Sequence, residues 1–340
     1  MSEETLRTTE LEEGREAERA GGVATERRAT PGGETAAPEG QKRIQGRSPW
    51  RLAWERLRRD RVAMVSLAFI VLIVLFALLA PVMAAITGHG SNQQFNDIGL
   101  TPDGLPKPPT GQFWFGTDDL GRDIFVRCAY GARISILVGV VATGFTIAIG
   151  VVLGLIAGYL GKIADTIISR IIDVVLAFPF LLFAIALVSI VGASLTVTIV
   201  VISMFSWASV ARIVRGQVLS IREREYIEAA RSLGSGSARI MFVDALPNVL
   251  APIIVYATLL IPSVIVTEAT LSFLGLGVPA PTATWGNMIS EAQAGGLYQI
   301  APWFLGFPSL LLLLLTLAFN LLGDGVRDAF DPRGDRMTQR

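Results

Sequence analysis

The sequence predicts an all-α membrane protein with six transmembrane helices. Of its 340 residues, 51% are hydrophobic and only 17% are charged, whereas soluble domains average about 25% charged residues. The chain also contains uncharged apolar stretches that supply six segments of about 20 residues, the length a helix needs to cross the hydrocarbon core. Its charged residues gather between these stretches, where they remain in water.

Two polar segments precede the first span. Residues 1–46 are rich in Glu, Arg, Thr, Gly and Ala and almost lack large apolar side chains. Such a segment buries too little surface to offset its ordering entropy, so we expect a disordered cytoplasmic tail. It lacks the apolar stretch of a secretory signal peptide. Residues 47–61 mix Arg with Trp50 and Trp54, which favours an amphipathic helix in the inner headgroup layer, or simply a polar lead-in to the membrane.

Residues 62–86 form the first predicted transmembrane helix, and residues 87–133 form an extracytoplasmic loop. Within this loop, Thr117 or Asp118 is a suitable N-cap for a short outer helix over residues 120–132. The nearby aspartates lack the twelve-residue spacing and terminal glutamate of an EF-hand, so we expect no metal site there.

The remaining apolar stretches predict a five-helix core over residues 134–323. The predicted spans are residues 134–160, 171–191, 196–213, 248–267 and 300–322. Gly192 and the two small residues after it break the long stretch into the third and fourth spans, and Pro179 is expected to kink the third. Residues 324–340 are expected to form a C-terminal cytoplasmic tail.

Basic residues predict the orientation of these spans. Lys and Arg are concentrated before the first span, between the second and third, around the loop after the fourth, and in the C-terminal tail. Cytoplasmic loops carry an excess of these residues, so we expect both termini to lie in the cytoplasm.

The loop between the fourth and fifth spans, residues 217–247, is the most informative segment. Tyr226, Ala229, Ala230 and Leu233 fall on one face of a predicted helix. Two alanines allow close approach to a partner surface.

The same loop also contains a charged residue and glycines that are expected to end the helix. Glu228 lies on the charged side of the helix, where it is able to pair with an arginine of a partner. Gly234 and Gly236 are expected to end the helix. Leu246-Pro247 then marks the return to the membrane, since proline is tolerated in the first turn of a helix.

This loop resembles a motif of binding-protein-dependent ABC importers, in which their permease subunits carry the pattern EAA-x3-G-x9-I-x-LP. Here the pattern begins at Glu228, places Gly234 and Leu246 at the expected offsets, and has Asp244 where isoleucine is usual. The resemblance implies that the loop docks onto a separate ATPase subunit. The residues it assigns to this coupling are Tyr226, Glu228, Ala229, Ala230, Leu233, Gly234, Leu246 and Pro247.

Three further strings narrow the resemblance. They are GTDDLGRD at residues 116–123, LSFLGLG at 271–277 and FNLLGDGVRD at 319–328. From about residue 47 to 334, the chain resembles the second, C-type permease subunit of dipeptide, oligopeptide and nickel importers. This implies the type I permease fold, a bacterial or archaeal cytoplasmic membrane, and di- or oligopeptide import, with nickel, glutathione or another small solute as alternatives.

The resemblance also implies the partners. We expect a heterodimer with a homologous permease subunit, two ABC ATPase subunits inside, and an extracytoplasmic substrate-binding protein. ATP and Mg would be bound by the ATPase subunits, so no cofactor is expected on this chain, and no nucleic acid is expected to bind.

Motifs for independent chemistry are missing from the sequence. It has no G-x4-GK[ST] phosphate loop and no HExxH zinc motif. We therefore expect a transporter subunit without an ATPase site, catalytic residues or a metal. A secondary transporter or channel is a distant alternative, which would need buried charges near mid-membrane and inverted repeats.

A few residues in the spans are candidates for packing or for the transport pathway. Gly150, Gly154 and Gly158 recur every four residues, which allows close helix packing in lipid; the helix they pack against belongs either to this chain or to the partner permease. Asp173 is expected to pair with Arg170 near the inner interface.

Glu268 stands alone at the outer end of the fifth span, where an ionisable group is costly and often functional. It either pairs with an arginine of the outer loop, such as Arg122 or Arg133, and shapes a gate, or meets the amino group of a passing peptide. Together with Pro179, it is our candidate for a gate or pathway residue.

Overall fold

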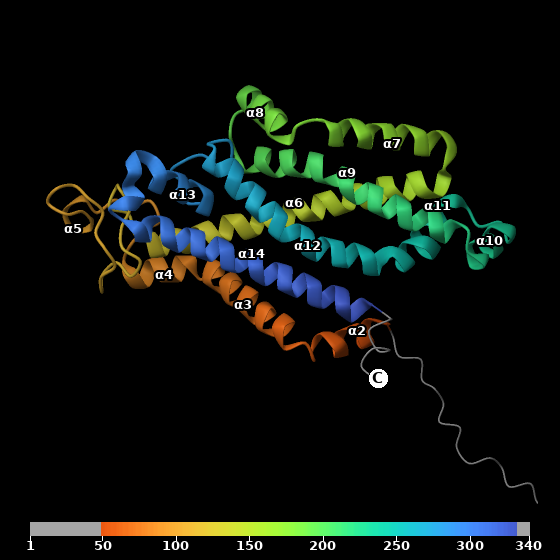
Figure 1. The fold of residues 1–340 in the computed structure, drawn as a ribbon, viewed down its shortest axis with the longest axis horizontal. Coiled ribbons are helices and arrows are strands. Elements are labelled where there is room, and N and C mark those ends of the chain that lie inside the picture. Colours follow the sequence, from red (N-terminus) through yellow and green to blue (C-terminus); the bar gives the residue numbers. More distant parts are fainter. Residues whose placement is uncertain (1–48, 332–340) are drawn as a thin grey trace, which may run out of the picture. The chain divides into compact units, whose positions relative to one another are not determined.

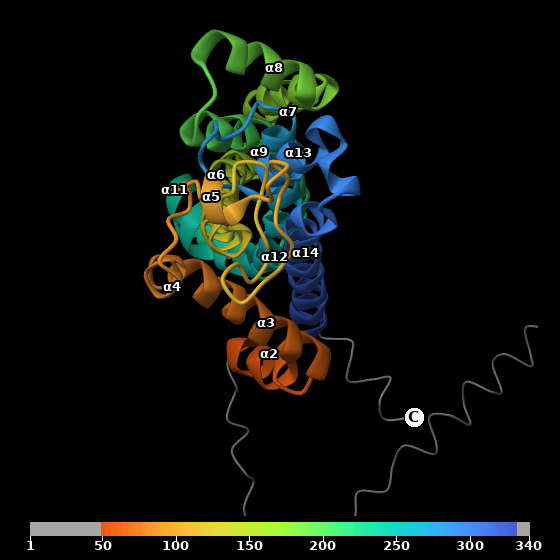
Figure 2. The same ribbon diagram turned by 90° about the vertical axis from the view of Figure 1, so that its left-hand side faces the viewer.

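The structure is a computed structural model, and it describes residues 49–331. The tail predicted over residues 1–46 and the end of the C-terminal tail therefore lie outside the described residues. Within 49–331 the chain is helical and has no strand, only two isolated antiparallel bridges, Leu100 with Pro106 and Thr117 with Asp123. Figures 1 and 2 show the arrangement of the helices.

The helices occupy most of the described chain. In order they are α2 (Pro49–Leu57), α3 (Arg61–Leu78), α4 (Ala80–Thr87), α5 (Asn96–Gly99), α6 (Ile124–Leu160), α7 (Lys162–Ala177), α8 (Phe180–Val191), α9 (Leu195–Arg222), α10 (Glu225–Ser232), α11 (Ser237–Arg239), the π-helix η1 (Ile240–Ala245), α12 (Leu246–Phe273), α13 (Trp285–Gln293), the 3-10 helix η2 (Ala294–Gln299) and α14 (Pro302–Phe330).

Within residues 49–331, five helical segments are long and apolar enough to cross a membrane. They are α3, α6, α9, the continuous helical run Ser237–Phe273, and α14. A sixth span results if α7 and α8 are counted together, although these helices are bent by 86° at the break between them. Pro179 lies at that break as the residue before α8, so the predicted kink of the third span is confirmed.

The prediction of a separate outer helix over residues 120–132 is wrong. Asp123 caps α6, since its side chain accepts hydrogen bonds from the backbone N–H groups of Phe125 and Val126. From there α6 runs without a break to Leu160. Its 37 residues correspond to about 55 Å at 1.5 Å per residue, so the predicted outer helix and second span are one element.

The other predicted spans agree with the structure in place but not in length. The first is divided into α3 and α4 at Leu79. The last extends to Phe330, so that residues 324–330 are helical and not part of a tail. Here α2 packs against the end of α14, because the Trp50 and Phe330 rings meet edge to face at 5.3 Å and Arg56 donates to the carbonyl of Asp331 at 3.1 Å.

The centre of the fold is the contact between α6 and α9, which run side by side in Figure 1. A Cβ atom added at Gly150 would lie 2.5 Å from the Cβ of Val210, and one at Gly154 would lie 2.7 Å from the Cβ of Val214. Gly158 meets Val218 in the same way. The glycine stripe of α6 therefore packs within this chain, which is the first of the two alternatives.

Ion pairs connect α7 to α9. The Arg212 guanidinium donates to Asp173 at 2.9 Å, and Arg215 holds Asp165 through two hydrogen bonds. The predicted pair of Asp173 with Arg170 is thus wrong. A residue on a neighbouring helix replaces the partner expected from the spacing within one helix.

Candidate functional site

The candidate site is the charged loop after α9, which the structure folds into a compact helical turn. α9 ends at Arg222, α10 covers Glu225–Ser232, and a helical run from Ser237 leads into α12. Glu225 and Glu228 lie in the first turn of α10 and Arg231 in its last turn. This distribution of charge complements the helix dipole and stabilises a short helix in water.

Gly234 ends α10 as predicted. Its φ of 81° is left-handed, which favours glycine. The N–H of Ser235 donates to the carbonyl of Ala230, and the N–H of Gly234 donates to that of Arg231, both at 3.0 Å. This pair of bonds is the Schellman motif. Gly236 does not stop the helix; it precedes α11 with an extended backbone.

One side of α10 is anchored in the protein. Ile227 is fully buried in an apolar cluster with Tyr159, Val218 and Ile240. Ala230, one turn later, is half-buried against the same cluster. Ala230 therefore faces the protein. The prediction that it lies on one face with Tyr226, Ala229 and Leu233 is wrong.

The opposite side of α10 is exposed and partly apolar. Tyr226 is 44% exposed and Leu233 is 86% exposed, and Ala229 is exposed between them. Exposed apolar residues that occur singly are ordinary, whereas a group of them is a candidate contact surface. This chain thus presents Tyr226, Ala229 and Leu233 on a helix whose other side is fixed.

Charged side chains flank this outward side. Glu228 is exposed, and it borders a surface depression with Lys162, Arg222 and Arg231. The Arg231 guanidinium lies over the Tyr159 ring, 5.8 Å from its centroid, so that α10 is also attached to the end of α6.

Leu246-Pro247 does not begin a new helix after a loop. It lies inside the helical run Ser237–Phe273, directly after the π-helix η1. Pro247 has no N–H to donate, and next to it the side-chain amide of Asn248 donates to the carbonyl of Asp244 at 2.7 Å. The helical run from Ser237 is thus continuous with α12, and residues 233–236 connect it to α10.

Glu268 has other partners than those predicted. It is fully buried, and its carboxylate accepts hydrogen bonds from Ser135 of α6 and Ser272 of α12, each at 2.8 Å. Arg122 donates instead to Asp118, and Arg133 is exposed. The predicted arginine pair is therefore wrong, and a role of Glu268 at a gate stays a prediction, as it does for Pro179.

A second polar cluster holds the outer loop against α13. Glu291 of α13 accepts hydrogen bonds from Arg122 at 2.9 Å and from Arg127 at 2.8 Å. Burial raises the pKa of Glu291, and the two arginines oppose this shift. Burial and the neighbouring Asp118 also raise the pKa of Asp119. Sequence spacing alone could not reveal this cluster, because Arg122 and Glu291 are 169 positions apart.

Two family models match parts of the chain. Residues 150–336 match the family described as "Binding-protein-dependent transport system inner membrane component". Residues 48–106 match "N-terminal TM domain of oligopeptide transport permease C". The candidate loop lies inside the first match.

Two curated relatives are similar over most of their length. The chain is 43% identical over 304 residues to the "Dipeptide transport system permease protein DppC" of Alkalihalophilus pseudofirmus, which covers 89% of this chain and 96% of the relative. It is 43% identical over 286 residues to the "Oligopeptide transport system permease protein OppC" of Bacillus subtilis, with 84% and 90% covered. A solved structure of the MetNI methionine ABC transporter is similar over 60% of this chain and 96% of that one, but with 21% identity and a TM-score of 0.49.

Proposed function

Because the chain belongs to the family of binding-protein-dependent transport system inner membrane components, we propose that it is the C-type permease subunit of an ABC importer for di- and oligopeptides. The names of its relatives support the substrate class, since they are called dipeptide and oligopeptide permeases. Nickel, glutathione or another small solute is the alternative.

The proposal extends to topology and partners. Counting α7 and α8 as one span gives six crossings, which supports having both termini on one side. The basic residues near the span ends favour the cytoplasm of a bacterial or archaeal cell as that side. The chain forms half of the path that the substrate takes across the membrane, and a homologous permease forms the other half. Two ATPase subunits bind and hydrolyse ATP, so this chain has no ATPase site of its own, and an extracytoplasmic protein delivers the substrate.

The exposed side of α10 is the observation that supports binding of an ATPase subunit. Tyr226, Ala229 and Leu233 provide an apolar surface for an ATPase subunit, and Glu228 beside them provides a partner for a basic residue. A helix anchored on one side and exposed on the other transmits force well. Ile227 packs with Val218 of α9, and the run from Ser237 leads into α12, so a displacement of α10 moves both spans.

Transport then follows from a shift of the permease between an inward-facing and an outward-facing conformation. ATP binding closes the ATPase pair, and the docked α10 helices favour the outward-facing conformation. ATP shifts this equilibrium only through its different affinity for the two states. Peptide specificity resides largely in the binding protein, so identifying what that protein binds would settle the substrate.

The test is co-purification of an ATPase subunit with tagged variants of this chain. Glu228→Arg reverses a charge on the docking surface, and Leu233→Asp places a charge on its apolar part. Both are expected to lose the ATPase while reaching the membrane in normal amounts. Asp103→Arg is the matched control, since Asp103 is an exposed acid of the outer loop. Normal co-purification and transport with both variants would refute the docking role.

A further inference from the structure

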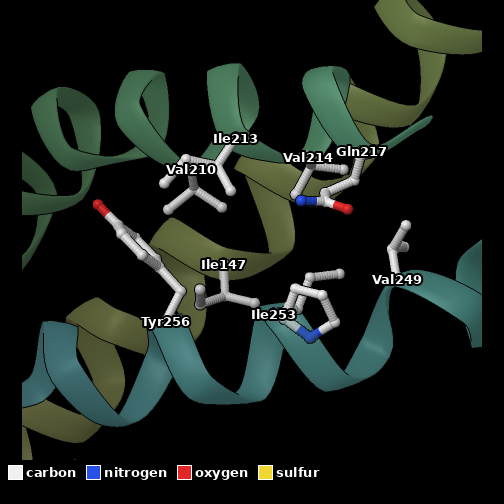
Figure 3. Close-up of a pocket in the computed structure, with 9 residues that line it drawn as sticks. Ile147, Val210, Ile213, Val214, Gln217, Val249, Ile253 and Tyr256 are labelled. Carbon is white, nitrogen blue, oxygen red and sulfur yellow. The ribbon is translucent and has the colours of Figure 1, made fainter. Parts of the chain in front are cut away.

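A groove runs between α9 and α12 on the side next to the docking loop. Its central part is an apolar pocket lined by Ile213 and Gln217 of α9 and by Pro252 and Tyr256 of α12, among others. Figure 3 shows the Gln217 amide at one end of this pocket and the Tyr256 ring at the other.

The groove continues in both directions from this pocket. Toward α10 it opens into a depression lined by Gln217 and Asn248, by the charged residues Glu223, Arg224 and Glu225, and by Tyr226 of the proposed docking surface, among others. Toward the end of α14 it opens into another, lined by Gln217, Tyr256 and Arg327. Gln217 borders all three parts, so they adjoin one another at this side chain.

Two polar side chains border the groove, and one of them, Tyr256, lies within a membrane span. Tyr256 is half-buried within Ser237–Phe273, a segment apolar enough to cross a membrane. Gln217 is exposed near the charged end of α9, between Arg215 and Arg222. Within residues 49–331, neither the Gln217 amide nor the Tyr256 hydroxyl has a hydrogen-bond partner. A polar group that faces lipid without a partner is costly, so the face of α12 that carries Tyr256 meets water, a transported molecule or another protein.

We propose that this groove is this chain's wall of the inner half of the transport route, where Gln217 and Tyr256 hydrogen-bond to the backbone of a passing peptide. This inference rests on the proposed function. It adds the helix faces that line the route and the chemistry by which they tolerate many peptide sequences.

The chemistry of the groove fits a peptide backbone. An amide and a hydroxyl both donate and accept hydrogen bonds and carry no charge, so they match peptide groups without selecting side chains. The central pocket is too small to enclose a side chain, so its apolar floor, which includes Val210 and Ile253, only presents a surface against which the peptide packs. From Asn248 to Tyr256 the helix rises about 12 Å, which corresponds to three or four extended residues at about 3.3 Å each.

The test uses cysteine accessibility in the complete complex with its partner permease, ATPases and binding protein. The native Cys128 is fully buried, so the unmodified chain serves as the unlabelled background. Tyr256→Cys and Gln217→Cys are treated with a charged, membrane-impermeant thiol reagent from the cytoplasmic side, with and without excess trialanine. The control is Leu72→Cys, because Leu72 lies near the middle of the apolar α3 and is 59% exposed.

We expect labelling at positions 256 and 217 but not at 72, and slower labelling when trialanine is present. Gln217→Leu should reduce the uptake rate at subsaturating trialanine about 2- to 10-fold, the factor that one net hydrogen bond carries. Its ATPase subunits should co-purify as in the wild type, which separates this effect from lost docking.

Two outcomes overturn the inference and are distinguishable. If the wild-type complex imports trialanine but Tyr256→Cys stays unlabelled, or cross-links to the partner permease, the groove is a subunit interface and the proposed function stands. If the wild-type complex imports no peptide and trialanine protects neither cysteine, the peptide function fails together with this inference.

Discussion

The hydroxyl of Ser135 lies 2.8 Å from the carboxylate of Glu268 and joins α6 to α12 at a fully buried position. Ser272, one turn after Glu268, donates to the other carboxylate oxygen at the same distance. Both oxygens of an acidic side chain thus have hydroxyl partners, and the acid acts here as a cross-link between two spans.

Replacing Glu268 should therefore affect stability according to the hydrogen bonds that remain. Glu268→Gln keeps the shape and most of the bonding capacity, so a small change is expected. Glu268→Leu leaves two buried hydroxyls to find other partners and should lower the free energy of unfolding by about 1–3 kcal/mol. Thermal unfolding in detergent, followed by tryptophan fluorescence, measures both. Equal midpoints for Leu and Gln variants would contradict the cross-link.

The glycine stripe of α6 offers a matched pair of substitutions. A Cβ at Gly154 would lie 2.7 Å from the Cβ of Val214 and 2.8 Å from the carbonyl oxygen of Ala211, whereas one at Gly144 meets nothing within 4 Å. Gly154→Ala should lower stability by about 1–3 kcal/mol through overpacking. Gly144→Ala on the same helix should leave it nearly unchanged. A similar effect of both variants on the unfolding midpoint would argue against close packing of α6 on α9.

The polar cluster of Glu291, Arg122 and Arg127 predicts that the stability of the fold falls as the pH rises from acid to neutral. Burial raises the pKa of Glu291 above its ordinary value of 4.5, so the folded protein holds this proton more tightly than the unfolded chain does. The resulting stabilisation is complete below about pH 4.5 and is lost as the pH rises through the raised pKa. Unfolding midpoints measured from acid to neutral pH should fall across this window. Glu291→Gln should flatten the decline, and an unchanged slope in that variant would rule out Glu291 as its source.

Much of the fold could be predicted because membrane spans obey strict local rules. Apolar stretches of the required length indicated the places of α3, α6, α9, α12 and α14. Gly234 ended α10 because a left-handed residue is required there. Pro179 lies at the break of the third span, although α12 and α14 continue through prolines. The spacing of Gly150, Gly154 and Gly158 predicted close packing of α6.

Predictions that depended on partners distant in sequence were less successful. Several aspartates near residue 120 are suitable helix caps, and the structure uses Asp123 while Asp118 pairs with Arg122. Asp173 pairs with Arg212, 39 positions away, although Arg170 is nearer in sequence. In each case several partners satisfied the same local rule, so spacing could not choose between them.

The sequence by itself determined that the chain enters the membrane, where its apolar helices lie, and that a charged helix with a glycine stop follows α9. These properties arise from local polarity and backbone geometry. Only the tertiary structure decided that Ile227 anchors α10 while Leu233 points outward, that Glu268 meets two serines, and that Gln217 and Tyr256 border one groove. Those facts depend on how helices distant in sequence pack together, and helical periodicity identifies a face without identifying what covers it.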